Sequence, residues 1–300
     1  MPQGIYLPEA LLDDTVISIE EACRRDRILR GRAVVCTADH DLEIEYGSKR
    51  YRMDREETAI GIRERTEKEI AVLSRVGKPI CFRVLDNTAF EPLISRRQVQ
   101  EEVQAYYMNG GLQPGDVIQT VVTHLEPFGA FVDIGCGITS LIGIENISVS
   151  RIRHPGERFA VHQRIPAVVT GIDRARGHVL LSHRELLGTW EENADHFLPG
   201  ETVEGIVRTV EPYGIFVELT PNLSGLAEYR PGLEPGDSVA VYVKSLNPEK
   251  MKVKLMIIDK LPDGGPKRIT WEDYFITDGT LDRWQYSPEC CHCKRICTEF

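Results

Sequence analysis

Long apolar runs, a secretory leader and a surplus of basic residues are all missing from this sequence. The chain of 300 residues has no run of 18 apolar residues, about the minimum for a membrane-spanning helix. The N-terminal segment MPQGIYLPEALLDD is acidic and lacks the basic and apolar regions of a signal peptide. Lys and Arg total 36 against 46 Asp and Glu, a formal net charge of -10, which disfavours a protein that holds duplex DNA over a broad basic surface. We expect a cytoplasmic protein that does not contact a membrane.

The cysteines do not have the spacing of a secreted disulfide scaffold. Four of the eight are scattered, and the other four form a C-terminal group, Cys290-Cys291-His292-Cys293-Lys294-Arg295-Ile296-Cys297. Cys290, Cys293 and Cys297 are the candidate metal ligands, but a structural zinc normally takes two ligands from each of two separated segments. The favoured interpretation is an exposed tail without a fixed role, with metal binding and redox chemistry as alternatives. No cofactor is expected.

What the sequence does contain is an internal repeat. GDVIQTVVTHLEPFGAFVDIG, residues 115–135, recurs as GETVEGIVRTVEPYGIFVELT, residues 200–220. Side chains alternate between the two faces of a strand, so Ala130, Val132 and Ile134 are expected to face a core, and Phe131 and Asp133 to face solvent. The second copy repeats this pattern, with Ile215, Val217 and Leu219 toward the core and Phe216 and Glu218 toward solvent.

A second aromatic residue precedes each of these strands. Pro127-Phe128-Gly129 and Pro212-Tyr213-Gly214 supply turn residues that place the second ring beside the first. Two aromatic rings on a sheet surface can stack nucleobases. The alternative is that Phe128 and Phe131 cover a domain junction or pack under a loop, but the recurrence of both rings favours a surface that binds nucleic acid.

These copies resemble the S1 domain, an RNA-binding barrel of the oligonucleotide-binding (OB) fold. The resemblance rests on G-x-V-x-G-x-V followed by [FY]-G-x-F-V-x-L, on a later apolar strand at residues 168–172, and on the closing Leu181-Ser182-His183-Arg184. It implies a mainly β protein made of tandem five-stranded barrels. Two segments have the apolar spacing of short amphipathic helices, which we expect to join the barrels. The first carries Val99, Val103 and Tyr106, and the second carries Leu186 or Leu187, Trp190, Ala194 and Phe197.

The S1 resemblance also implies which residues contact RNA: two aromatics, a His, an Asp late in the fourth strand and an Arg that opens the fifth. In the middle copy these positions hold Phe128, Phe131, Gly143, Asp173 and His178, and in the third copy Tyr213, Phe216, Glu228, Asn247 and Lys252. The aromatics are kept in both copies while the polar positions change. The resemblance therefore implies base stacking but puts base-specific recognition in doubt.

Local cations lie next to the expected aromatic surface. In the third copy, Lys250, Lys252 and Lys254 alternate with apolar residues, which predicts three ammonium groups on one strand face. In the middle copy, Arg174 and Arg176 lie near the aromatics, and five more basic residues follow the connection between the third and fourth strands: Arg151, Arg153, His154, Arg158 and Arg164. These charges could simply solvate the surface, but their position favours a shallow groove for phosphates.

A diverged copy precedes the other two. LRGRAVVCTADHDLEIEYG aligns with them if Gly31 matches Gly115 and Gly47 matches Gly135, and PLISRR would be its closing strand. In this copy the face that should carry an aromatic holds carboxylates instead: Asp41, Glu43 and Glu45. Carboxylates repel phosphate and cannot stack. We therefore expect the first domain not to bind RNA through this face, and to serve as a spacer or a protein-docking module.

These observations predict five segments: a lead-in at residues 1–25, a diverged S1-like domain at 26–110, S1 domains at 111–198 and 199–259, and a tail at 260–300 that packs on the third barrel. The lead-in is interpreted as a frayed tail with a short helix at residues 17–22. Its apolar residues also allow a docking segment that folds on a partner: Ile5, Tyr6, Leu7, Leu11 and Leu12.

The leading functional hypothesis is a non-catalytic protein of the ribosomal S1 kind, which implies binding of single-stranded mRNA near the small ribosomal subunit. The N-terminal region and first domain would make the contact with the subunit. Two alternatives stay open: an RNA-processing or transcription-associated factor, and a protein-docking scaffold. A catalytic domain is disfavoured, because the residues left outside the three predicted barrels are too few to form one and show no nucleophile elbow or phosphate loop.

Overall fold

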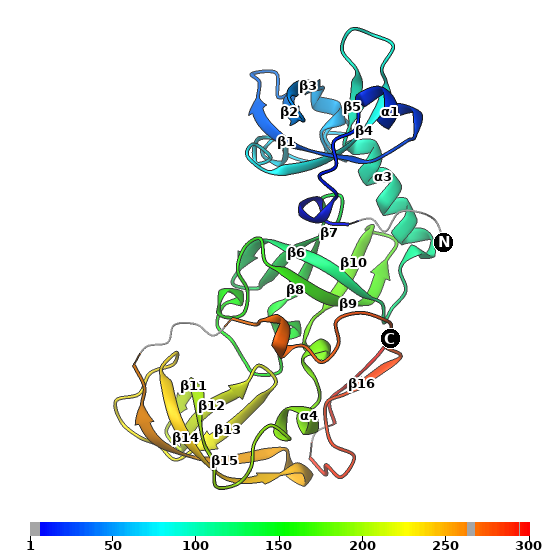
Figure 1. Cartoon of the computed structure of the whole chain (residues 1–300). Helices are drawn as coiled ribbons and strands as arrows, with labels where there is room; N and C mark the ends of the chain where they lie inside the picture. The colour runs from blue at the N-terminus through cyan, green and yellow to red at the C-terminus, as the bar shows by residue number, and fades with distance from the viewer. Residues whose placement is uncertain (1–6, 263–267, 294) are drawn as a thin grey trace.

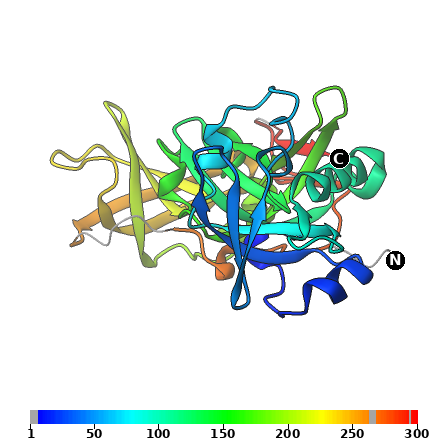
Figure 2. The ribbon, with the colours of Figure 1, turned by 90° about the horizontal axis from the view of Figure 1, so that it is seen from above.

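The protein was analysed as a computed structural model that describes residues 7–262, 268–293 and 295–300. Three β units follow one another along the chain, and a tail then runs back beside the last two (Figure 1). Seen from above, the first unit lies over the second while the third projects to one side (Figure 2). In the described part of the chain, no helix combines the length and the apolar character that crossing a membrane requires.

The first unit is an open five-stranded sheet in the order β3-β2-β1-β4-β5, called here the first sheet. Its strands are β1 (Leu29–Cys36), β2 (Leu42–Tyr46), β3 (Lys49–Met53), β4 (Pro79–Asp86) and β5 (Leu93–Ser95). The accompanying helices are α1 (Ile19–Arg24), α2 (Ile70–Leu73) and α3 (Arg97–Tyr106). The predicted barrel is therefore not closed in this copy, because β3 and β5 are not paired.

The second and third units are closed five-stranded barrels, which confirms the mainly β fold predicted from the repeat. The middle barrel contains β6 (Val117–Glu126), β7 (Gly129–Gly135), β8 (Ile138–Gly143), β9 (Arg164–Asp173) and β10 (His178–Ser182). The third barrel contains β11 (Thr202–Glu211), β12 (Gly214–Thr220), β13 (Leu223–Ala227), β14 (Ser238–Asn247) and β15 (Lys252–Lys260). Each barrel closes by a parallel pairing between its third and fifth strands.

The core face of each repeat strand was predicted correctly. Ala130, Val132 and Ile134 are buried in the middle barrel, and Ile215, Val217 and Leu219 are buried in the third. Leu42, Ile44 and Tyr46 fill the same positions in the first sheet. Burial of such side chains contributes roughly 1.5 to 3 kcal/mol each, so the alternating pattern alone fixes which face of each strand points inward.

The first sheet shares its strand order with the barrels, which supports a third, diverged copy, but one predicted alignment is wrong. The residue after Gly31 pairs with Glu45, and the residue after Gly205 pairs with the equivalent Glu218. Gly31 therefore matches Gly205, not the position of Gly115. A Cβ atom at these two glycines would lie only 2.6 and 2.5 Å from a second-strand side chain, which explains why both first strands carry glycine there.

The connectors between the units are helical, as expected, but the second is shorter than expected. In α3, Val99 and Val103 are fully buried, while Tyr106 is 38% exposed and the next residue, Tyr107, completes the buried stripe instead. The Tyr107 hydroxyl donates to the Ile134 carbonyl at 2.8 Å, which fixes α3 to the middle barrel. The second connector has only a single helical turn, α4 (Trp190–Ala194), after the 3-10 turn Arg184–Leu187.

The tail was predicted to pack on the third barrel alone. Its described residues, 268–293 and 295–300, contact both the middle and the third barrel. The Ile269 amide donates to the Arg158 carbonyl, and the Leu281 amide to the Gly115 carbonyl, both in the middle barrel and both at 2.9 Å. Tyr286 then joins the core of the third barrel. The tail ends in a two-stranded sheet of β16 (Arg283–Gln285) and β17 (Cys297–Glu299). It therefore fixes the two barrels to each other.

The N-terminal segment packs inside the molecule, so the prediction of a frayed tail is wrong for the described residues; Ile5 and Tyr6 lie outside them. The buried Glu9 carboxylate accepts from Arg96 Nε at 2.6 Å and from the Cys81 amide at 3.1 Å, both in the first sheet and its connector. The Glu9 amide donates to the Asp133 carboxylate of the middle barrel at 2.8 Å. The segment thus joins the first two units, and Asp133 is buried, not solvent-facing as predicted.

Candidate nucleic-acid interface

Two tight hairpins place an aromatic ring at the same corner of each barrel. Glu126 pairs with Gly129, and the equivalent residues of the third barrel pair in the same way, so each turn has two residues. Phe128 and Tyr213 occupy the second turn position and are 54% and 69% exposed. Gly129 is required by a close approach, because a Cβ atom there would lie 2.4 Å from the Ile142 carbonyl oxygen.

The second ring of each pair lies on the strand that follows the turn. Phe128 and Phe131 have ring centroids 6.0 Å apart, and Tyr213 and Phe216 have centroids 6.3 Å apart, both edge to face. Phe131 and Phe216 are half-buried, so each keeps part of its ring accessible. None of the four rings is buried in a core. Each barrel presents two neighbouring rings whose centroid distance is within the usual range for interacting aromatic side chains.

His124 joins the middle pair and was missed by the sequence analysis. It lies opposite Phe131 in the β6–β7 hairpin, and its ring stacks on that of Phe131 at 6.3 Å with an interplanar angle of 29°. Nε2 of the histidine contacts the Glu126 carboxylate at 2.7 Å. Counting residues back from the two-residue turn would have placed His124 beside Phe131. The third barrel has Thr209 at this position.

The row of outward side chains next to each aromatic differs between the barrels. In the third barrel, Phe216 pairs with Leu226, which pairs with Lys254. In the middle barrel, Phe131 pairs with Leu141, and the parallel register places Leu180 where the third barrel has its lysine. The middle surface is therefore apolar where the third surface is cationic.

The predicted lysine strip is only partly on a strand. Lys252 and Lys254 are exposed on β15, as expected from the alternation with buried Val253. Lys250 lies before the strand in the 3-10 turn Pro248–Lys250, and Met251 then adopts the left-handed conformation with φ of 46°. This reversal places Lys250 outside the strand face, so the strip has two ammonium groups and not three.

The polar residues predicted at the end of the fourth strand form a hairpin turn in both barrels. Asp173 accepts from the Ala175 and Arg176 amides, both at 3.1 Å, and the Arg174 Nε donates to the Met108 carbonyl at 2.9 Å. Asn247 of the third barrel likewise accepts from the Lys250 amide at 2.9 Å. These contacts give Asp173 and Asn247 a role in shaping the turn. Arg176 and His178 are exposed beside the first of these turns.

Arg158 is completely buried, contrary to the prediction that it lines a groove for phosphate. Its two terminal nitrogens contact the Glu218 carboxylate at 2.8 and 2.5 Å. Arg208 contacts the same carboxylate at 2.7 and 2.8 Å. Glu218 is therefore not solvent-facing as predicted; it joins the middle barrel to the third.

The pKa values of the two acidic residues at equivalent strand positions, Glu218 and Asp133, are shifted in opposite directions. Burial would raise the pKa of Glu218, but Arg158 and Arg208 outweigh it and hold that pKa below its usual value. Burial, together with the neighbouring Glu9 carboxylate, raises the pKa of Asp133 to about 7. The junction between the barrels is thus a closed ion cluster, while at the junction with the first sheet we expect Asp133 to titrate near neutral pH.

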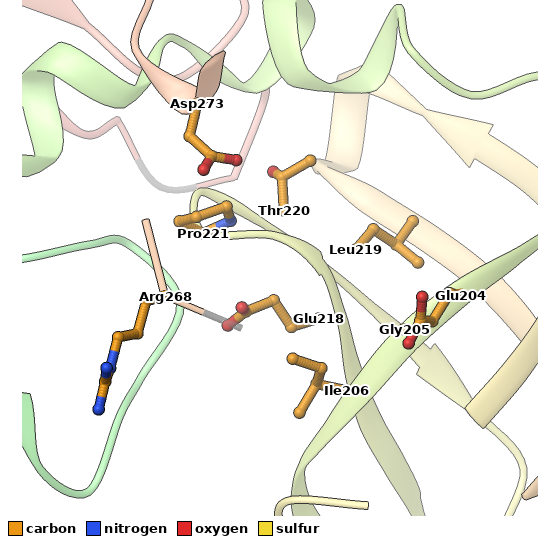
Figure 3. Close-up of a pocket in the computed structure, with 9 residues that line it drawn as sticks. All are labelled: Glu204, Gly205, Ile206, Glu218, Leu219, Thr220, Pro221, Arg268 and Asp273. Carbon is orange, nitrogen blue, oxygen red and sulfur yellow. The ribbon is translucent and has the colours of Figure 1, made fainter. Parts of the chain in front are cut away.

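A groove lies beside the aromatic pair of the third barrel, with a volume of about 500 Å³. Tyr213 and Phe216 line one side, and Val149 and Arg151 of the middle barrel line the other. A much smaller cavity of about 60 Å³ lies between the tail and the third barrel, bordered by Glu218 and Asp273 (Figure 3). This smaller cavity has carboxylates and no aromatic ring along its wall, so of these two cavities the larger one suits a nucleotide.

The first sheet lacks the aromatic surface, as predicted, but its carboxylates are not free. The β1–β2 register places Glu43 where the barrels have Phe131 and Phe216. Arg50 Nη1 lies 3.4 Å from the Glu43 carboxylate, and Arg52 Nη2 lies 2.6 Å from that of Asp41. Arginines on β3 therefore pair with two of the carboxylates on the predicted negative face, Glu43 and Asp41. This face has a carboxylate where the barrels have their stacking ring.

The candidate metal ligands do not converge. Cys290, Cys293 and Cys297 are exposed free thiols. Within the residues that the structure describes, no three His, Cys, Asp or Glu side chains are arranged to hold a metal ion.

Comparison with known protein families matches the middle barrel. Residues 112–184 match the S1 RNA binding domain. This region contains the hairpin with Phe128 and Phe131 and ends at Arg184. The resemblance predicted from the repeat is therefore confirmed for this barrel.

Whole-chain comparisons find similar proteins in bacteria. The chain is 30% identical to the small ribosomal subunit protein bS1 of Leuconostoc lactis over 184 residues, covering 57% of this chain and 42% of that protein. It is 31% identical to the bS1 homolog of Bacillus subtilis over 186 residues, covering 57% of this chain and 48% of that protein. The chain thus spans less than half the length of these relatives.

Among solved structures, a multidomain protein with nucleic acid binding domains from Streptococcus pneumoniae aligns over 77% of this chain and 73% of its own, with 12% identity and a TM-score of 0.25. A match at this level carries no argument about the arrangement of the units.

Proposed function

We propose that this chain, which contains an S1 RNA binding domain, is a non-catalytic protein that holds single-stranded RNA on two tandem barrels. The observation that supports this most is the recurrence of one exposed aromatic pair, Phe128 with Phe131 and Tyr213 with Phe216, at the same corner of two closed barrels. Base stacking on aromatic side chains tolerates any sequence, because every base has a flat face.

The two barrels contribute differently to this binding. The middle barrel offers His124 and two exposed leucines around its rings, so stacking and apolar contact dominate there. The third barrel adds Lys252 and Lys254, which supply cations for phosphate. Neither surface is strongly basic, and each alone would bind weakly. Because the tail and the Arg158–Glu218 cluster hold the barrels together, one RNA strand gains affinity by reaching both.

The similarity to bacterial bS1 proteins supports a place in translation, with mRNA at the small ribosomal subunit in the cytoplasm. In this proposal the N-terminal segment and the first sheet contact the subunit. Glu43 in place of a stacking ring and the paired arginines of β3 suit a protein contact better than RNA. The alternative is an RNA-processing or transcription-associated factor that uses the same barrels.

Substitution of one ring in each barrel tests the proposal. Phe131→Ala combined with Phe216→Ala should weaken binding of an unstructured RNA by roughly 2 to 6 kcal/mol, since loss of a stacking aromatic costs about 1 to 3 kcal/mol per base. Fluorescence anisotropy titration measures the affinity, and circular dichroism checks that the barrels remain folded.

Phe90→Ala is the matched control. Phe90 is a fully exposed aromatic residue in the connection between β4 and β5 of the first unit, far in sequence from either pair. Its loss should leave RNA affinity unchanged. An affinity of the double variant equal to that of Phe90→Ala would contradict stacking and favour the protein-docking scaffold.

A further inference from the structure

A second cleft lies between the middle barrel and the C-terminal tail and has a volume of about 640 Å³. Three arginines line it: Arg151 and Arg184 from the middle barrel and its connector, and Arg295 from the tail. One carboxylate, that of Glu145, opposes them. In a chain with a formal net charge of -10, this is a local reversal of sign.

The arginines of this cleft, called here the tail cleft, are differently held. Arg184 is fixed by the buried Glu185, with Nε and Oε1 3.1 Å apart. Arg151 and Arg295 are exposed, and within the described residues neither has a hydrogen bond or ion pair through its side chain. Two of the three guanidinium groups are therefore available to an anion from outside.

The wall that carries Arg295 is a built part of the fold. The Thr298 hydroxyl donates to the Glu185 carboxylate at 2.8 Å, and Cys297 pairs with Gln285 in the β16–β17 sheet. These contacts hold the end of the tail against the middle barrel. The tail cleft is thus a feature of the folded chain and not of a loose terminus.

The position of the tail cleft links the two aromatic pairs. Val149 and Arg151 line both this cleft and the groove beside Tyr213 and Phe216, so the two are adjacent. At the other end, Ile144 lines the cleft, and its amide donates to the Phe128 carbonyl at 2.9 Å. The tail cleft with its three arginines therefore borders residues that lie next to each of the two aromatic pairs.

We propose that the tail cleft binds the phosphodiester backbone of one RNA strand as it crosses from the middle barrel to the third. This inference rests on the proposed function and extends it. Arg151 and Arg295 contact phosphates from opposite walls, and the tail acts as part of the RNA-binding surface. Guanidinium groups suit this role because they bind phosphate oxygens through two parallel hydrogen bonds.

Removal of both free arginines tests the crossing. Arg151→Ala with Arg295→Ala should weaken binding of an RNA of about 20 nucleotides, long enough for two barrels, by about 3- to 30-fold. The same variant should bind an RNA of about 5 nucleotides, enough for one barrel, like the wild type. The control is Arg153→Ala with Arg283→Ala, which removes one arginine from the same loop and one from the tail, both outside the cleft.

A chemical probe gives an independent readout without substitution. Cys297 lines the tail cleft, while Cys290 is exposed outside it. Bound 20-nucleotide RNA should slow alkylation of Cys297 by N-ethylmaleimide several-fold and leave Cys290 unaffected, with mass spectrometry following each site.

The outcomes separate this inference from the proposed function. Two results would overturn the crossing and leave the barrel sites intact, provided that the wild type binds RNA tightly. In one, Arg151→Ala with Arg295→Ala loses no more RNA affinity than Arg153→Ala with Arg283→Ala. In the other, bound RNA does not slow alkylation of Cys297. Equal weakening toward long and short RNA would also overturn it. No binding of either RNA would reject the proposed function itself, and the crossing with it.

Discussion

Glu218 is the residue whose removal should disturb the joined barrels most. Its carboxylate receives four contacts from two arginines, Arg158 and Arg208, all between 2.5 and 2.8 Å. Glu218→Gln keeps the size of the side chain and removes its charge. Arg208 would retain Glu157, but the completely buried Arg158 would keep only the Ser148 hydroxyl, at 3.3 Å from its Nε.

The expected loss of stability follows from leaving the buried charge of Arg158 without a carboxylate partner. Breaking a buried ion pair by removing one partner costs about 3 to 5 kcal/mol, because a desolvated charge is left without compensation. The amide oxygen of Gln can still accept one hydrogen bond, so we expect a loss of about 3 kcal/mol. That is a large part of a total stability of about 5 to 15 kcal/mol.

Urea unfolding followed by circular dichroism measures this loss. Glu228→Gln is the matched control in the same barrel, since Glu228 pairs with Lys244 at the surface and its loss should cost about 0 to 1 kcal/mol. The pKa of Glu218 is held below its usual value, so its contribution is present above that usual value and is lost as the pH falls through the lowered pKa. The difference between wild type and Glu218→Gln should therefore shrink in acid. A loss equal to that of Glu228→Gln would refute the reasoning.

Three further outcomes are expected. The pKa of Asp133 is raised from its usual value of 3.8 to about 7, so the folded chain holds a proton that the unfolded chain releases. The contribution of Asp133 to the free energy of unfolding should therefore fall by up to about 1.4 kcal/mol per pH unit as the pH rises from about 4 to about 7. Urea unfolding at several pH values measures this fall, and Asp133→Asn should make it smaller. Tyr286→Phe should destabilise the chain by about 1 to 3 kcal/mol in thermal unfolding, because the Asn222 carbonyl loses its 2.5 Å hydrogen bond; an unchanged midpoint would contradict that bond. In salt titrations, Lys252→Ala with Lys254→Ala should make the slope of log affinity against log salt shallower by roughly 1.4 if each contacts one phosphate, and an unchanged slope would remove both from the interface.

The alternation of apolar residues was enough to predict the barrel strands, because burial acts on each side chain locally. The same reasoning placed Phe128, Phe131, Tyr213 and Phe216 outside the cores, and turn chemistry placed the two rings of each pair together. His124 was within reach of the same logic, since it depends only on counting back from a two-residue turn.

Contacts between the units were not predictable from periodicity. Asp133 and Glu218 lie on outward faces of their strands, as the alternation says, but the neighbouring unit covers each of them. Alternation reports which face of a sheet a residue occupies and not what lies against that face. Arg158 was misjudged for the same reason, because its buried partner comes from another barrel.

The open first sheet and the path of the tail were missed because both depend on long-range packing. Gly31 was aligned by spacing along the chain, while the structure aligns it by its close approach to the second strand. Tail residues such as Ile269 and Tyr286 are apolar enough to require burial, but their sequence does not say which barrel buries them.

The claim that RNA lies on the aromatic pairs of both barrels is tested most directly by ultraviolet cross-linking of an unstructured RNA to the full chain, with mass spectrometry of the linked peptides. We expect cross-links in both hairpins, at Phe128 or Phe131 and at Tyr213 or Phe216. Cross-links confined to the first unit, for example at the exposed Phe90 between β4 and β5, would contradict the account.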